Sequence, residues 1–177
     1  MKKYELTAEF IEQWGKKLFR IKALISFGSV EAGELGGYVE KEDNLAQDGD
    51  AWVYGNAEVC GDAWVCGNAR VYGDAEVCGD ARVCCDAEVY GNADYLLIGR
   101  IGSRFSFTTF FKNKDKGITV SCGCFLGTIA EFRAKVTDTH GNNKHAKIYN
   151  LAADMAELQI LGEEYFDKLN TNKSEPF

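Results

Sequence analysis

The sequence predicts a mainly β protein, in which a three-sided solenoid of parallel strands is followed by a small α+β unit that ends in two helices. Three observations support this fold class: eight consecutive six-residue repeats from Gly49 to Leu96, three strand-like segments after them, and two helix-like segments near the C-terminus. The chain has 177 residues, of which 46% are apolar and 27% charged, a composition typical of globular proteins.

The N-terminal segment, residues 1–30, is predicted to cap the repeats. Apolar residues alternate loosely between Leu18 and Leu24, which indicates a strand preceded by a hairpin or a short helix. The terminal turn of a solenoid exposes unpaired backbone groups, so we expect this segment to cover them.

The repeats have the consensus Gly-(Asp/Asn)-Ala-x-Val-(Tyr/Cys) and define a solenoid domain over residues 31–96. One β-branched and one small residue per repeat fit a flat interior and its tapering corners, and Gly-Asx fits a tight turn. The less regular residues 35–40 and Leu45 are expected to add an earlier turn of chain. The repeated valines are Val53, Val59, Val65, Val71, Val77, Val83 and Val89.

Three repeats would make one coil, so outward residues 18 apart should stack in columns. Cys60 would lie beside Cys78, and Cys66 beside Cys84. An acidic column of Glu58, Glu76 and Asp94 would cost free energy. We expect the aromatic column to meet another chain, as an oligomer interface, or the terminal segments of this chain, or else to be simply a product of repeat duplication; its residues are Tyr54, Tyr72 and Tyr90.

The C-terminal unit is predicted to cover residues 97–170, with a frayed tail at 171–177. Strands are expected at 95–98, 105–111 and 117–122, with a hairpin turn at 113–117. Helices are expected at 129–139, stopped at Gly141, and at about 144–161. The second helix shows an apolar stripe made of Ile148, Leu151, Ala152, Met155 and Leu158.

Charge is divided unevenly along the chain. The repeats from Gly49 to Leu96 hold nine acids and two bases, which equals the whole net charge of −7. Residues 97–135 hold seven bases and two acids. This balance argues against duplex nucleic acid as the main partner but permits a small anion. We expect no membrane insertion, because the sequence has no apolar run of membrane length. The seven cysteines, an odd number, favour the reducing cytoplasm.

Hydroxyls, glycines and a guanidinium gather at the start of the C-terminal unit. Arg104 offers a bidentate fork to phosphate or carboxylate, and Gly127-Thr128 opens a predicted helix whose N-terminus attracts anions. The alternative is that Arg104 pairs with an acid of the solenoid and Thr128 only caps its helix. In that case the phenylalanines of this region, Phe105, Phe107, Phe110 and Phe125, would belong to the hydrophobic core. The predicted ligand-binding residues are Ser103, Arg104, Thr108, Thr109, Phe110, Gly127 and Thr128.

No catalytic residue, metal site or cofactor is predicted. Cys122 and Cys124 lack the second ligand pair that a zinc site needs, so we interpret them as structural. His140 and His145, the only histidines, lie in a polar Gly-Asn-Asn region and are interpreted as loop residues.

The repeats resemble the hexapeptide-repeat family of left-handed parallel β-helices. The whole chain resembles a group of uncharacterised hexapeptide-repeat proteins of phages and prophages, through these hexads and residues 32–37, 101–104, 108–110 and 122–128. The resemblance implies a left-handed β-helix, a homotrimer and a bacterial cytoplasmic setting. It implies no established activity.

Three function classes follow. The leading hypothesis is a non-catalytic homotrimer that binds a small anion, such as a cyclic nucleotide or an ADP-ribose-type molecule, and sequesters a nucleotide immune signal of the host. A purely structural assembly protein is the first alternative. A hexapeptide acyltransferase with His140 as its base is a weaker one, because no histidine lies in the repeats.

Overall fold

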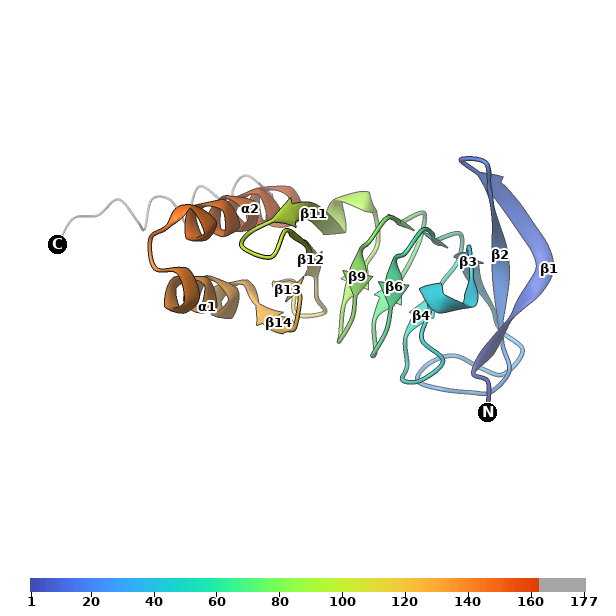
Figure 1. Ribbon diagram of the computed structural model, residues 1–177. Helices are drawn as coiled ribbons and strands as arrows, with labels where there is room; N and C mark the ends of the chain where they lie inside the picture. The colour runs from blue at the N-terminus through green and yellow to red at the C-terminus, as the bar shows by residue number, and fades with distance from the viewer. Residues whose placement is uncertain (163–177) are drawn as a thin grey trace. The chain divides into compact units, whose positions relative to one another are not determined.

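The computed structural model describes residues 1–162 and is mainly β with two C-terminal helices (Figure 1), as predicted. It divides into two compact units, the first formed by Met1–Asn92 and the second beginning at Ala93. Within residues 1–162, no helix has the length and apolar character needed to span a membrane. The predicted tail at 171–177 and residues 163–170 of the predicted C-terminal domain lie outside the described residues.

The first unit opens with an antiparallel hairpin of β1 (Tyr4–Gln13) and β2 (Lys16–Ala23). Its two turn residues, Trp14 and Gly15, both have positive φ, at 54° and 75°. This is the type I′ geometry that matches the twist of paired strands, so the segment forms a hairpin and not a short helix. β2 also pairs antiparallel with β3 (Leu35–Val39).

Each of the first seven repeats contributes a strand of two residues that ends at its valine. Strands 18 residues apart pair in parallel, with Val53 opposite Val71 and Val59 opposite Val77. All seven repeat valines are fully buried, which fixes this register. The strands are β4 (Trp52–Val53), β5 (Glu58–Val59), β6 (Trp64–Val65), β7 (Arg70–Val71), β8 (Glu76–Val77), β9 (Arg82–Val83) and β10 (Glu88–Val89).

The prediction of a regular left-handed parallel β-helix over residues 31–96 is wrong. The first unit contains several short sheets of unequal size: a mixed sheet ordered β1-β2-β3-β5-β8, a parallel sheet β10-β7-β4 and a parallel pair β6-β9. The antiparallel hairpin joins one of these sheets through β3, so that sheet mixes both strand directions. The sequence period described the repeats but carried no information about this added hairpin.

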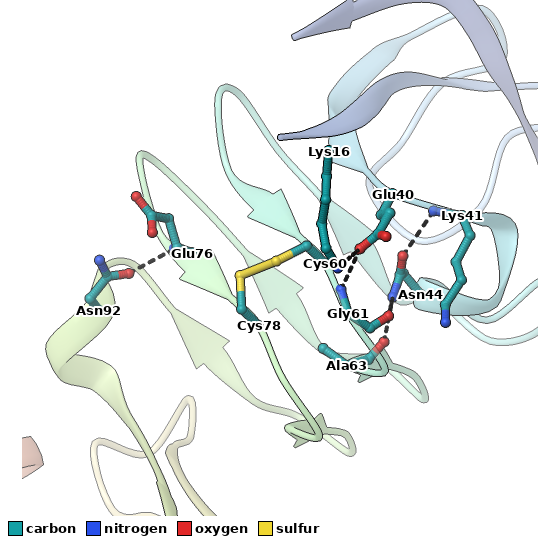
Figure 2. The surroundings of a disulfide bond; sticks show 10 residues. All are labelled: Lys16, Glu40, Lys41, Asn44, Cys60, Gly61, Ala63, Glu76, Cys78 and Asn92. Carbon is teal, nitrogen blue, oxygen red and sulfur yellow. Dashed lines mark hydrogen bonds and ion pairs between the residues drawn. A yellow bond between two sulfur atoms is a disulfide. The ribbon is translucent and has the colours of Figure 1, made fainter. Parts of the chain in front are cut away.

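The cysteines also depart from expectation. The sequence favoured free thiols, but Cys60 and Cys78, which follow β5 and β8, form a disulfide (Figure 2). Close by, the Glu40 carboxylate accepts hydrogen bonds from the Lys16 ammonium at 2.8 Å and from the Gly61 amide at 2.6 Å. Both contacts tie the N-terminal hairpin and β3 to the repeats.

The second unit contains an antiparallel sheet ordered β11-β12-β13-β14, which packs with two helices. The fourth strand was not predicted, because its four residues include a glycine and end at a helix cap. The strands are β11 (Tyr95–Ile101), β12 (Ser106–Lys112), β13 (Ile118–Cys122) and β14 (Phe125–Thr128), and the helices are α1 (Ile129–His140) and α2 (Lys144–Leu161). Short 3-10 helices lie at Glu42–Asn44 and Asn92–Asp94.

The apolar stripe predicted for α2 does not form its core face. Ala152 is buried, but Leu151 and Met155 are 62% and 57% exposed, and Ile148 and Leu158 are exposed as well. The helix instead turns its small residues to the sheet, where alanines permit close approach. The buried apolar residues of α2 are Ala146, Tyr149, Ala152, Ala153, Ala156 and Ile160.

A buried lysine holds the chain that precedes the repeats. The Lys3 ammonium donates to the backbone carbonyls of Asp48, Gly49 and Ala51 at 3.3, 3.3 and 2.9 Å. It also lies over the Phe27 ring, 4.9 Å from the centroid. Burial lowers the pKa of Lys3 to about 8, so the side chain is mostly charged at neutral pH.

We therefore predict that Lys3→Met destabilises the first unit by about 2–3 kcal/mol, because buried carbonyls lose their donor. Lys2→Met is the matched control: Lys2 forms an exposed ion pair with Glu42 and its loss should cost under about 1 kcal/mol. Urea denaturation measures both. Equal effects of the two substitutions would contradict the assigned role of Lys3.

The acidic column is only partly as expected. Glu58 and Glu76 lie side by side in the β5–β8 pair, whereas Asp94 forms an ion pair with Lys112 at 2.9 Å in the second unit. Burial, followed by the charge of Glu76, raises the pKa of Glu58. The folded protein thus holds this proton more tightly than the unfolded chain, and its stability falls as pH rises from the unfolded pKa through the folded one.

Glu58→Gln should therefore stabilise the protein at pH 7, by about 0.5–1 kcal/mol, and the gain should disappear at a pH of about 4. Asp80→Asn is the control, because Asp80 is exposed and asparagine occupies the equivalent position in other repeats. Thermal unfolding at both pH values measures the difference. A gain that persists unchanged in acid would rule out charge repulsion as its cause.

Candidate functional site

A half-enclosed pocket of about 190 Å³ lies in the second unit. It is bounded by the β11–β12 turn, the β13–β14 turn, the second half of α1 and one residue of α2. The lining residues are Ser103, Arg104, Ser106, Cys122, Gly123, Cys124, Phe125, Phe132, Lys135, Val136, Thr139, His140 and Tyr149.

The β11–β12 turn places two of these side chains. Ile101 pairs with Ser106, so residues 102–105 form the connection. Gly102 has φ of 72°, and a side chain at this position would collide with the Tyr149 hydroxyl. Glycine thus lets the turn pack closely against α2, while Ser103 and Arg104 stay exposed at the edge of the pocket.

The β11–β12 turn forms one wall of the pocket, and a two-residue turn between β13 and β14 forms another. Cys122 pairs with Phe125, and Gly123 occupies the first turn position with φ of 61°. The Thr108 hydroxyl donates to the Cys122 sulfur at 3.2 Å. The side chain of Phe125 packs against Phe132 with ring centroids 5.6 Å apart, which gives the pocket an apolar floor.

Tyr149 connects the helices to both turns. Its ring stacks with His140 at 5.7 Å, and its hydroxyl shares a hydrogen bond with the Cys122 thiol. Burial, followed by Cys122, raises the pKa of Tyr149, and the positive charge of Arg104 acts in the opposite direction. Tyr149 is therefore a neutral hydrogen-bonding group at neutral pH.

Among residues 1–162, the pocket lining includes three basic side chains and no carboxylate. Arg104 and Lys135 contribute the positive charge, and His140 is the third basic side chain. The described residues 1–162 hold no acid within ion-pair distance of Arg104, whereas Lys135 pairs with exposed Asp138 at 3.1 Å. The carbonyl end of α1 offsets part of this field, by roughly 0.3–1 kcal/mol. The balance favours an anion.

The sequence-predicted ligand residues divide between several places. Ser103 and Arg104 lie at the pocket. Thr108, Thr109 and Phe110 are buried in β12, and Phe110 belongs to the core of the second unit. None of these three lines the pocket.

The predicted anion site at the start of α1 is already occupied by a carboxylate of the chain. Glu131 accepts hydrogen bonds from the Thr128 amide and hydroxyl at 2.8 and 2.9 Å, and its own amide donates to the Thr128 hydroxyl. A side chain on Gly127 would press on the same carboxylate. These contacts form a capping box, so Thr128 caps its helix.

Sequence reasoning did not place Lys135, His140 or Tyr149 in an anion pocket. Lys135 lies in the basic stretch that the charge distribution marked out, which was the available signal. His140 ends α1 and His145 begins α2, so both are half-buried rather than free in a loop. Tyr149 had no sequence signal, because only packing brings it to the two turns.

Comparison of the chain with protein-family models and with curated proteins finds no match. Together with the separate short sheets, this finding overturns the resemblance to hexapeptide-repeat β-helix proteins of phages. The expectations drawn from that resemblance alone therefore lose their support.

The predicted tyrosine column is a real stack of rings. Tyr54 and Tyr72 lie 4.7 Å apart with an interplanar angle of 12°, and Tyr72 and Tyr90 lie 4.7 Å apart at 8°. The Tyr54 hydroxyl contacts Ser29 at 3.0 Å. Tyr90, at the end of the stack, is 54% exposed.

Proposed function

We propose that the second unit binds a small anionic ligand in the pocket beside Arg104 and leaves it chemically unchanged. The observation that carries this proposal is the group of three basic side chains on a pocket to which residues 1–162 contribute no carboxylate. A guanidinium that has no acidic partner among the described residues keeps its donors available for phosphate or carboxylate.

The size of the pocket limits what it can enclose. Its volume of about 190 Å³ is below the roughly 300–1,000 Å³ of pockets that enclose a drug-sized ligand. A phosphate or carboxylate group with a few attached atoms fits this space, whereas a whole dinucleotide does not. A larger ligand would leave part of itself outside.

Within this class we favour a nucleotide. Its phosphate would meet Arg104 and Lys135, and its base could stack on an exposed aromatic ring, because every base has a π face. Phe105, 71% exposed in the same turn as Arg104, offers such a ring. Tight binding without turnover would sequester a nucleotide signal.

The test is a binding screen of the purified full chain with inorganic phosphate, nucleoside monophosphates, cyclic dinucleotides, ADP-ribose and acetyl-coenzyme A. Thermal shift identifies the ligand, calorimetry gives its Kd, and chromatography of the ligand released by heat shows whether it is intact. Arg104→Ala should raise the Kd by about 5- to 150-fold, the equivalent of about 1–3 kcal/mol.

Arg100→Ala is the matched control, because Arg100 is exposed on the same hairpin but does not line the pocket. Its Kd should stay within about twofold of the wild type. Equal Kd values for Arg104→Ala and the wild type would refute the site. A chemically altered ligand would refute the non-catalytic function, and a protein that binds none of the probes would favour the assembly function.

The second candidate function is assembly, and the tyrosine stack is the observation that favours it. Three stacked rings at the surface form a rigid aromatic strip, and tyrosine is enriched at protein interfaces. We propose self-association through this strip, and its stoichiometry is a quantity for the test to measure.

Tyr72→Glu should dissociate such an assembly, because it replaces the central ring of the stack with a charged side chain that has no aromatic face. Tyr72→Phe keeps the ring and should leave the assembly intact. Native mass spectrometry at several concentrations, with circular dichroism as a check of folding, measures both variants. A wild-type protein that is monomeric at all concentrations would rule out this function.

A further inference from the structure

The residue after each repeat valine occupies the same backbone position in every repeat. In the parallel sheet of β4, β7 and β10 this position carries tyrosine, and in the other two strand pairs it carries cysteine. Because residues 18 apart lie side by side, each cysteine has a second cysteine beside it. The two pairs are Cys60 with Cys78 and Cys66 with Cys84.

The first pair shows that this backbone position accepts a cross-link. Cys60 and Cys78 form a disulfide with their Cα atoms 4.7 Å apart, inside the range found for natural disulfides (Figure 2). The Cys60 amide donates to the Val77 carbonyl at 3.0 Å. Parallel strand geometry alone therefore brings the two sulfurs together.

The second pair has the same backbone geometry. Val65 lies opposite Val83, and the Cys66 amide donates to the Val83 carbonyl at 3.0 Å, matching the bond of Cys60. Both cysteines are half-buried and neither is cross-linked. The Cys66 thiol hydrogen bonds with the Cys84 thiol, and this contact, together with burial, raises the pKa of Cys66.

We propose that Cys66 and Cys84 are a redox modification site that forms a second disulfide when the protein meets a small-molecule disulfide such as oxidised glutathione. The Cys84 thiolate attacks one glutathione sulfur and releases the first glutathione thiol. The Cys66 thiolate then attacks the Cys84 sulfur and releases the second. Two protein thiols are oxidised and one glutathione disulfide is reduced, with the thiol protons passing to the released glutathione.

The new bond would cross-link two short strands. β6 and β9 form a sheet of only two strands, each two residues long, so few backbone hydrogen bonds hold the pair. A cross-link between residues 66 and 84 would restrict the unfolded chain and stabilise this part of the first unit. The repeats would then be more stable in oxidising than in reducing surroundings.

Cys85 is the competing thiol. It is exposed, directly follows Cys84 and has φ of 60° at a position where the preceding repeats have glycine. Exposure makes it open to glutathione, so it must be removed from the test. The Cys85→Ser variant keeps Cys66 and Cys84 and has one exposed thiol fewer.

The experiment treats reduced wild type and Cys85→Ser with oxidised glutathione, alkylates the remaining thiols and digests with trypsin. Cleavage after Lys41, Arg70, Arg82 and Arg100 gives one peptide with Cys60 and Cys66, one with Cys78 and one with Cys84. We expect all three peptides to be joined in Cys85→Ser, and the third to be released in the Cys84→Ser, Cys85→Ser double variant. Cys78→Ser should release only the middle peptide.

Thermal unfolding provides a second test that does not depend on the peptide analysis. Oxidised Cys85→Ser should unfold at a Tm about 5 °C or more above the oxidised double variant, and a reductant should abolish the difference. A third peptide that stays free or carries only glutathione in Cys85→Ser would overturn the proposal. So would a Tm that the oxidation of Cys66 and Cys84 does not raise.

Discussion

The parallel alignment of valines 18 residues apart is the constraint on which the first unit depends. Strands of two residues form few hydrogen bonds, so burial of the valines and alanines must fix their register. Full burial of a valine contributes roughly 1.5–3 kcal/mol, and a slip by one residue would turn each valine outward. Once this register is set, each outward residue on a paired strand lies beside the residue 18 positions away.

The interactions between these neighbouring outward residues are favourable in some columns and unfavourable in others. The same alignment stacks Tyr54, Tyr72 and Tyr90, joins Cys60 to Cys78 and presses Glu58 against Glu76. A repeat that copies a side chain also copies its interactions, favourable for aromatic rings and thiols and unfavourable for like charges. The stacking, cross-linking and charge repulsion described here are therefore properties of columns of equivalent residues.

The second unit places its functional groups by a different principle. Two hairpin turns and the adjoining ends of two helices converge on one pocket, and each contributes a few side chains. Tight packing of Gly102 against Tyr149 fixes one wall, and the capping box of Thr128 fixes the start of α1. That capping box already satisfies the helix N-terminus, whereas the basic side chains of the pocket come from the β11–β12 turn (Arg104) and from later positions of α1 (Lys135 and His140).

The sequence by itself determined the mainly β class, the period of 18, the column partners and the bounds of both helices to within about one residue. These features depend on local propensity and on the spacing of residues along one chain. Tertiary structure decided the rest. It joined the N-terminal hairpin to the repeats in a mixed sheet, turned alanines instead of Leu151 and Met155 toward the core, and brought Tyr149 to Arg104. Such outcomes depend on which surfaces fit closely in space, and spacing along the chain does not encode that fit.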